Sequence, residues 1–365
     1  MRSPDPAAFA DLLAGYCLEA SAGQQVLVRS TTLAAPLLLE LQRALLEREA
    51  WPLVRAELPD ATLGFYRHAR DVHLDGIPSL DLDEAKKIDA TLSIQAPGNT
   101  RALTGVEPER IARLARARRD VREATLKKRW ATTLWPTEAN AQEAGMSLPE
   151  FGAFVERALF LDQADPVQAW GRLRALQAEL IGRLERARTL RIEAPGTELE
   201  LGVRGRTWVN SDGRRNMPSG EVFTGPHEQS ANGRIFFGVP SSPAGVEVGG
   251  VELELRDGEV VAARAQRGEE YLQRALGTDE GARRVGEVGI GTNVGIDRPI
   301  GAILFDEKIK GTVHLALGRS YPETGGKNVS ALHWDLILDL RAGGQLFADD
   351  DLIMRDGEFV APRAA

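Results

Sequence analysis

The chain is poor in cysteine, in histidine and in long apolar runs. Its 365 residues include one cysteine, Cys17, and five histidines. A single cysteine excludes an intramolecular disulfide and a metal site built from thiolates, and its apolar neighbours favour a core position. No segment reaches the roughly 18 apolar residues of a membrane span. Because the first residues also do not have a signal-peptide pattern, we expect a cytoplasmic protein with no membrane partner.

Positive charge is not in excess either. The chain has 45 Lys and Arg against 53 Asp and Glu, a formal net charge of -8 and a pI near 5.4. This balance argues against a nucleic-acid partner, because binding phosphates requires clustered excess Lys and Arg. The local run from Arg113 to Arg129 is interleaved with Asp120 and Glu123. We interpret it as the solvated face of a helix.

The first half of the chain alternates helical and strand-like segments. Apolar spacing predicts helices at 5–20, 34–48 and 107–117 and strands at 25–28, 53–58 and 90–94. This βαβ-like order predicts an α/β fold with a largely parallel sheet covered by helices. A long helix at 166–188 closes this half, so we place an N-terminal α/β domain at residues 1–188.

The second half is richer in glycine and short strands. Residues 233–265 read as a β-meander with a hairpin turn at Asp257-Gly258, and a helix is expected at 269–276. We therefore predict a C-terminal mixed α+β domain at residues 189–365. Two domains also suit a chain that exceeds what one hydrophobic core usually supports.

Most of the candidate ligands lie in this second half. In the predicted strand 331–340, His333 and Asp335 share one face, opposite an apolar face that contains Trp334. His314 lies in a second strand, opposite the apolar side chains of Val313, Leu315 and Leu317. Both histidines are thus expected on strands whose other face packs in the core.

Two glutamates next to glycines complete the set. Glu221 follows a Pro-Ser-Gly turn and Glu287 stands among glycines, which allow the backbone to approach an ion closely. Mixed carboxylate and imidazole donors suit two divalent ions such as zinc, cobalt, manganese or magnesium. Five side chains leave open coordination positions, which is typical of a catalytic site. The predicted metal ligands are Glu221, Glu287, His314, His333 and Asp335.

Other motifs are weaker. Gly289, Gly291 and Gly295 approximate a dinucleotide-binding fingerprint, but Pro299 stands where the required helix would grow. We therefore disfavour a dinucleotide cofactor. His227 lies six residues after Glu221, and the sequence leaves open whether it lines the same site.

The spacing of these motifs resembles the aminopeptidase T family of metallopeptidases. The resemblance rests on N-x-P-[ST]-G-E-V-F, G-A-R-R-x-G-E, H-x-A-L-G-x-x-Y and H-x-D, and on WATTLWPT beginning at Trp130. It implies an N-terminal α/β domain, a C-terminal domain with two metal ions, a homodimer, and peptide substrates with a free N-terminus. Position by position it gives the same five metal ligands, and it makes Tyr321 the catalytic tyrosine.

One position departs from the family pattern. Family members often carry an acidic residue five residues before the first ligand histidine, whereas Glu307 lies seven before His314. Whether Glu307 reaches the metal ions is left open. The five ligand positions themselves are intact.

The expected function is removal of N-terminal amino acids by a metal-activated water. Glu287 is the candidate bridging carboxylate and proton acceptor, and Tyr321 is the candidate donor to the tetrahedral oxyanion. Two alternatives stay open: another binuclear metallohydrolase, and a non-catalytic binding dimer stabilised by metal. Assays on free and blocked peptides and on phosphate esters distinguish these functions.

Overall fold

The computed structural model describes residues 4–361 and divides into two compact units. Unit 1 comprises residues 1–167 and returns for residues 213–218, and unit 2 comprises residues 168–212 and 219–365. The sequence placed the domain boundary near residue 188. The contacts divide the chain earlier, because the long helix α10 (Pro166–Leu184) buries Leu180 and Leu184 in the core of unit 2.

Unit 1 is built on a five-stranded sheet in the order β2-β1-β3-β4-β8. Its strands are β1 (Gln25–Thr31), β2 (Trp51–Glu57), β3 (Ala90–Gln95), β4 (Arg129–Leu134) and β8 (Asn216–Met217). Every strand pair in this sheet is parallel. The predicted parallel sheet is therefore confirmed, with β8 contributed by the short return of the chain from unit 2.

Helices alternate with these strands, as the sequence predicted. They are α1 (Pro6–Asp11), a π-helix (Leu12–Cys17), α2 (Ala35–Leu46), α3 (Ala61–His68), α4 (Asp71–Leu74), α5 (Ser79–Lys87), α6 (Pro108–Ala117), α7 (Arg119–Leu126), α8 (Glu138–Glu143) and α9 (Leu148–Ala158). Asp5 caps α1 by accepting a hydrogen bond from the Ala7 amide. Cys17 is fully buried, in agreement with its expected core position.

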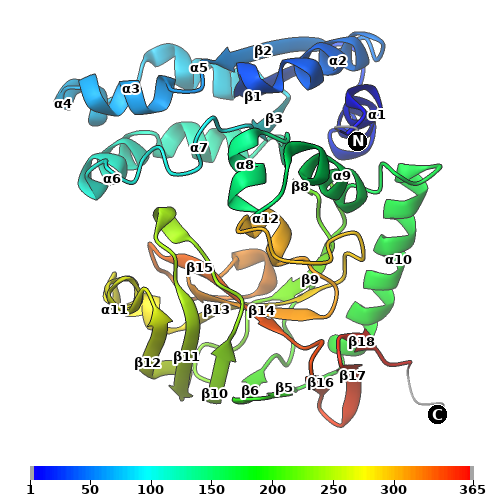
Figure 1. The fold of residues 1–365 in the computed structure, drawn as a ribbon, viewed down its shortest axis with the longest axis vertical. Helices are drawn as coiled ribbons and strands as arrows, with labels where there is room; N and C mark the ends of the chain where they lie inside the picture. Colours follow the sequence, from blue (N-terminus) through cyan, green and yellow to red (C-terminus); the bar gives the residue numbers. More distant parts are fainter. Residues whose placement is uncertain (1–3, 362–365) are drawn as a thin grey trace. The chain divides into compact units, whose positions relative to one another are not determined.

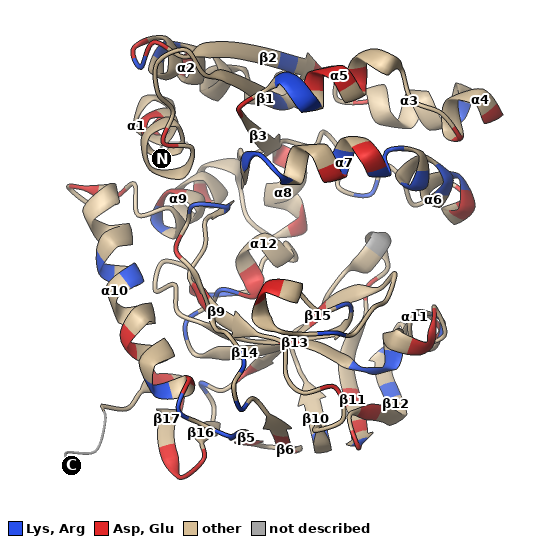
Figure 2. Ribbon diagram, turned by 180° about the vertical axis from the view of Figure 1, so that it is seen from behind, with Lys and Arg blue, Asp and Glu red and all other residues tan. Residues whose placement is uncertain are grey.

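The arginine-rich run forms α6 and α7, where basic and acidic residues alternate (Figure 2). Arg113 pairs with Asp75 at 2.5 Å, and Arg119 pairs with Glu123 at 2.9 Å. These are partly exposed contacts, each of which contributes little to stability. The run is a salt-bridged helix surface, as its charge pattern indicated.

Unit 2 combines α10 with two antiparallel sheets (Figure 1). The eight-stranded sheet has the order β12-β11-β10-β6-β5-β16-β17-β18 and the five-stranded sheet the order β15-β14-β13-β9-β7. The larger sheet contains β5 (Thr189–Ala194), β6 (Thr197–Gly202), β10 (Asn232–Phe237), β11 (Gly249–Arg256), β12 (Glu259–Arg267), β16 (Gln345–Ala348), β17 (Asp351–Arg355) and β18 (Glu358–Phe359). The smaller contains β7 (Val209–Ser211), β9 (Glu221–Thr224), β13 (Val285–Gly291), β14 (Thr312–Gly318) and β15 (His333–Asp339).

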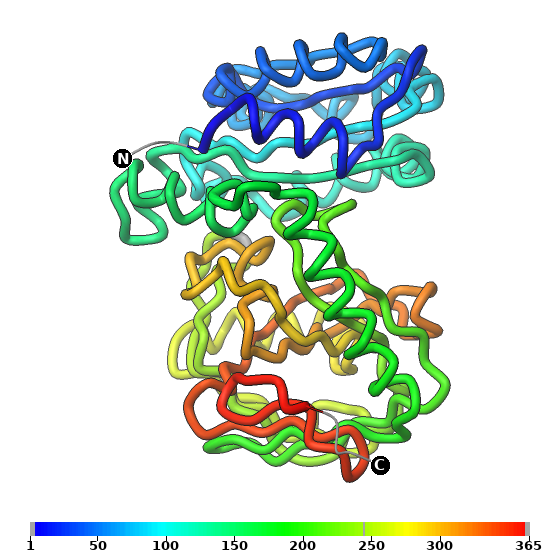
Figure 3. Tube along the Cα trace, turned by 90° about the vertical axis from the view of Figure 1, so that its right-hand side faces the viewer, coloured from blue at the N-terminus to red at the C-terminus, as the bar shows by residue number. Residues whose placement is uncertain are grey.

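The larger sheet joins segments that are distant in the sequence. β16 pairs with β5, so strands from the two ends of this unit lie side by side (Figure 3). The predicted meander is β10-β11-β12, with Asp257 and Gly258 at its hairpin turn, and the predicted helix is α11 (Glu269–Leu276). A mixed α+β unit is thus confirmed.

One hydrophobic core joins the two sheets of unit 2. It contains Ile192 and Leu253 from the larger sheet and Val288, Leu315 and Leu336 from the smaller. One face of the five-stranded sheet is therefore committed to the core, which leaves its other face for polar side chains. No helix among residues 4–361 is long and apolar enough to cross a membrane.

Candidate metal site

The strand order of the smaller sheet brings the predicted ligands together. Glu221 begins β9, Glu287 lies in β13, His314 in β14, and His333 and Asp335 in β15, and these four strands are successive neighbours. Residues paired across antiparallel strands project to the same face. The register therefore decides which side chains can meet.

The register places all five side chains on one face. Gly289 pairs with His314, and Gly291 pairs with Glu221. Ala316 pairs with Glu287 on one side and Asp335 on the other. The alternate residues, including Val288, Leu315 and Trp334, lie in the core. The two-residue period thus puts the candidate metal ligands on one face of the sheet and the core side chains on the other.

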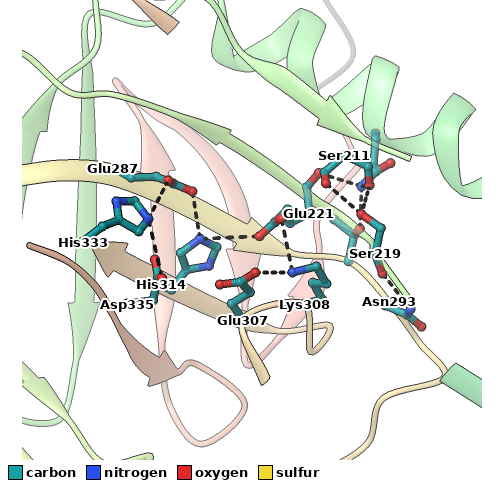
Figure 4. Close-up of polar contacts among 12 residues, drawn as sticks. Ser211, Ser219, Glu221, Glu287, Asn293, Glu307, Lys308, His314, His333 and Asp335 are labelled. Carbon is teal, nitrogen blue, oxygen red and sulfur yellow. Dashed lines mark hydrogen bonds and ion pairs between the residues drawn. The ribbon is translucent and has the colours of Figure 1, made fainter. Parts of the chain in front are cut away.

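The side chains on this face converge closely (Figure 4). His314 Nε2 lies 3.3 Å from Glu287 Oε1 and 3.5 Å from Glu221 Oε2. His333 Nε2 lies 3.7 Å from Glu287 Oε2 and 3.7 Å from Asp335 Oδ2. The ligand atoms of Glu287, His314 and Asp335 all lie within 4.8 Å of one another. We call these three residues, with His333, the inner group.

A second group overlaps the first at His314. It consists of Glu221, Glu307 and His314, whose ligand atoms also lie within 4.8 Å of one another. We call it the outer group. Glu307, whose role the sequence left open, directly follows the short helix α12 (Ile303–Asp306) and reaches this group despite its shifted spacing.

Lys308 is a member of the site that the sequence did not indicate. Its side chain is fully buried, its Nζ lies 3.4 Å from Glu221 Oε1, and it also contacts Glu307 Oε1. A lysine beside a glutamate in a loop is ordinarily an exposed residue, so the sequence gave no reason to single it out. Only the folded chain brings its ammonium to the carboxylates.

Burial dominates the electrostatics of the carboxyl groups. It raises the pKa of Glu221 to about 7 against the opposing charge of Lys308. Burial, with the nearby charge of Glu307, also raises the pKa of Asp335 to about 7. A pKa raised this far means that the positive charge around these carboxyl groups is too small to offset the cost of burying their ionised form.

The histidine at the centre responds in the opposite way. Burial by itself lowers the pKa of His314, but its hydrogen bond to Glu287 and the charges of Glu221 and Glu287 outweigh burial and raise the pKa to about 10. The site therefore attracts cations, and His314 takes a proton when no other cation is present. A divalent ion is the natural competitor of that proton.

The predicted catalytic tyrosine lies at the edge of the site. The Tyr321 ring packs edge-on against His333 at 5.2 Å between centroids and contacts Phe223 at 5.7 Å. Burial raises the pKa of Tyr321 above its ordinary value, and the charges of Glu287 and Asp335 raise it further. The phenol consequently keeps its proton and can serve as a hydrogen-bond donor.

Two other polar residues lie in other surroundings. His227 is exposed, and its Nε2 lies 2.9 Å from the carbonyl oxygen of Arg204. Burial raises the pKa of Asp339, but the hydrogen bonds and charge of Arg341, which lies 2.7 Å away, outweigh burial and keep that pKa below its ordinary value. Neither belongs to the two groups found among the described residues.

The glycines of the disfavoured fingerprint serve the strand instead. Gly289 and Gly291 lie in β13, an antiparallel strand. A Cβ atom at Gly289 would meet Cε1 of His314 at 2.1 Å, and one at Gly291 would meet the carbonyl oxygen of Ile309 at 2.0 Å. These positions are glycine because an imidazole and a backbone segment lie directly against the sheet.

A family model and several known proteins match this chain over most of its length. The family model described as thermophilic metalloprotease (M29) matches residues 5–359. The chain belongs to the M29 family. Aminopeptidase 2 of Geobacillus stearothermophilus is 31% identical to it, over 96% of this chain and 94% of that protein. Aminopeptidase T of Thermus aquaticus is 30% identical, over 79% of each chain.

A solved structure has the same fold. Wild-type AmpT from Thermus thermophilus superposes with a TM-score of 0.85 at 26% identity, covering 98% of this chain and 99% of that one. The predicted membership of the aminopeptidase T family is confirmed, as is the prediction of a peptidase hydrolase. As a metalloprotease the protein depends on divalent metal; the number and identity of the ions stay predictions.

The buried donors of this M29 protein fit a divalent ion. Glu221 Oε2, Glu287 Oε2 and His314 Nδ1 are buried without a hydrogen-bond partner among the described residues. Buried carboxylate oxygens that accept no hydrogen bond are costly unless a cation binds them. The donor set is hard to borderline and contains no thiolate, a combination that suits zinc, manganese and other divalent ions.

Proposed function

We propose that this M29 protein is an aminopeptidase that binds two divalent ions through Glu221, Glu287, His314, His333 and Asp335. The observation that carries the proposal is the convergence of these side chains on one face of a sheet whose other face is packed. The names of the relatives, aminopeptidase 2 and aminopeptidase T, support peptides with a free N-terminus as substrates. Zinc, cobalt, manganese and magnesium all suit these donors.

When bound, the ions would polarise the scissile carbonyl of the substrate and lower the pKa of the attacking water. The chain's own residues do the rest. Glu287 lies in the inner group, between His314 and His333, where its carboxylate can accept a proton. Tyr321, which keeps its phenolic proton, can donate to the oxyanion that forms at the carbonyl.

The buried site also excludes water from the acidic groups. Glu221 and Glu287 are 4% and 5% exposed, and His314 is fully buried. In such a setting, electrostatic contacts are stronger than in water. The substrate's amine and carbonyl therefore meet fixed charges rather than mobile solvent. A homodimer, which the family resemblance implies, stays a prediction that analytical ultracentrifugation checks.

The first test is substrate selectivity. We expect metal-loaded protein to hydrolyse leucyl p-nitroanilide and not its N-acetylated form, because an aminopeptidase requires the free amine. Equal rates on blocked and free substrates, or turnover of a phosphate ester in their place, would assign another metallohydrolase. Metal-dependent thermal stability without hydrolysis of any of these substrates would assign the non-catalytic binding dimer.

The second test removes the proposed proton acceptor. Glu287→Gln should lower kcat by about 100-fold or more, the scale of general-base contributions. Its circular dichroism should match that of the wild type. Glu323→Gln makes the same chemical change at an exposed residue of the 3-10 helix Pro322–Thr324 and should keep full activity. Wild-type turnover by Glu287→Gln rejects the assignment.

A further inference from the structure

Lys308 is a fully buried lysine whose ammonium lies inside the outer group (Figure 4). It lies 3.4 Å from Glu221 Oε1 and contacts Glu307 Oε1, so it forms ion pairs with two of the three members of that group. A buried ammonium is costly unless it is paired and hydrogen-bonded. The carboxylates of Glu221 and Glu307 provide that pairing.

Backbone contacts hold the main chain of Lys308 in place. Ile309 forms a parallel bridge with Asn293, and the amide of Asn293 donates to the Lys308 carbonyl at 2.9 Å. The Asn293 side chain in turn donates to the Ser219 carbonyl at 2.8 Å, two residues before Glu221. Lys308 and Glu221 are thus held to each other through Asn293, independently of their own ion pair.

The two groups differ in this respect. Within 4 Å, the ion pairs of Lys308 among the described residues are with Glu221 and Glu307, both in the outer group. The inner group has two imidazoles, from His314 and His333, and no ammonium in ion-pair contact. A divalent ion entering the outer group meets a like charge that is already paired with one oxygen of Glu221 and one oxygen of Glu307. A proton on His314 competes with an ion in either group, because both groups contain His314, whereas Lys308 is an additional competitor in the outer group.

We propose that Lys308 is a resident cation that competes with divalent metal for Glu221 and Glu307, so that the inner group fills first and the outer group fills second and more weakly. This inference rests on the proposed metal ligands but not on the proposed hydrolysis. It gives the outer group two alternative occupants of positive charge. The Lys308 ammonium stabilises the carboxylates in the absence of the second ion and has to move when that ion binds.

The experiment is a metal-binding titration of the wild-type protein. Protein stripped with a chelator is dialysed against increasing Co²⁺, and bound cobalt is quantified by atomic absorption. We expect two steps, with dissociation constants that differ by about tenfold or more, which corresponds to a modest difference in binding free energy. Glu221→Gln should lose the weak step and keep the tight one. Two equal sites in the wild type overturn the proposal.

Variants of the lysine test the cause of the difference. Lys308→Met should bring the weak step at least about tenfold closer to the tight one, because the competing charge is gone. Lys308→Arg keeps the charge and should keep two unequal steps. Lys310→Met is the matched control: it removes a lysine of the same segment whose partner is Glu358, outside the site, and should bind cobalt as the wild type does.

Thermal unfolding gives a second readout that needs no turnover. Without metal, Lys308→Met leaves buried carboxylates unpaired, so it should unfold at a lower temperature than the wild type, and cobalt should restore more of its stability. If Lys308→Met does not fold, the wild-type titration still decides. An unchanged weak step in a folded Lys308→Met overturns the proposal. Absence of hydrolysis with the two unequal steps intact would instead reject only the aminopeptidase function.

Discussion

A glycine opposite His314 determines how the imidazole lies on the sheet. Gly289 pairs with His314 across β13 and β14, and a Cβ atom there would meet the ring at 2.1 Å from Cε1 and 2.2 Å from Nε2. The ring therefore occupies the space that any other residue at 289 would fill. This position brings Nε2 within 3.5 Å of both Glu221 and Glu287.

Gly289→Ala should displace the His314 ring and weaken the site. Overpacking of this kind costs about 1–3 kcal/mol of stability, and a displaced catalytic group lowers kcat/KM by about 100-fold. Cobalt dialysis, thermal unfolding and peptide hydrolysis measure the three effects. Gly182→Ala, in α10 where an added Cβ meets nothing within 4 Å, should keep full activity. A fully active Gly289→Ala would show that the ring has room to move.

At the scale of elements, strand periodicity foretold the arrangement of the site. The alternation around His333 and Asp335 predicted a polar face opposite Trp334 and Leu336, and β15 has those two side chains in the core. A two-residue period is encoded locally, so the sequence is sufficient to place side chains on faces. The same reasoning placed His314 on β14.

Strand periodicity did not reveal the site residues that lie outside the strands of the sheet. Glu307 and Lys308 follow α12, a helix of one turn, and reach the carboxylates through the bridge between Asn293 and Ile309. Such a placement depends on non-local contacts that leave no pattern in the sequence. The contacts divide the chain after residue 167 and the sequence suggested a boundary near residue 188, because the long helix looks the same in sequence whichever core it joins.

The long helix supports the site through one buried amide. Gln177 of α10 donates from Nε2 to the Glu221 carbonyl at 2.8 Å and to Thr292 Oγ1 at 3.1 Å. Its side chain is fully buried, so it joins β9 to the segment that follows β13. The hydrogen bond from α10 thereby helps to hold the backbone that carries Glu221.

Gln177→Leu should destabilise unit 2 and weaken metal binding. The buried Glu221 carbonyl and Thr292 hydroxyl lose their donor, which costs about 1–3 kcal/mol. Urea unfolding and cobalt dialysis measure the two effects. The converse change at the preceding position, Leu176→Gln, falls on a side chain that is 43% exposed and should alter stability by less than about 0.5 kcal/mol. Equal stabilities of the two variants would contradict this role of the amide.

For the whole molecule, the site makes stability depend on pH in an unusual direction. The pKa of Glu221 and Asp335 is about 7 in the folded protein without metal, above the range near 4 of an unfolded chain. The folded form then binds more protons, so this contribution to stability is present at low pH and is lost as the pH rises through about 7. His314, with a pKa of about 10, has the same sign.

The melting temperature of the metal-free protein should therefore fall between about pH 5.5 and about pH 8, where most salt-bridged carboxylates no longer titrate. Metal takes the deprotonated carboxylates, so the stabilisation by cobalt should be larger at the higher pH, and at 100 times the dissociation constant it amounts to about 2.7 kcal/mol. Differential scanning fluorimetry with chelator and with cobalt measures both. Glu221→Gln combined with Asp335→Asn removes two of the titrating groups and should flatten the metal-free profile. A metal-free melting temperature that rises over this range in the wild type would mean that the buried carboxyl groups are already ionised, held by Lys308 and His314 without help from metal.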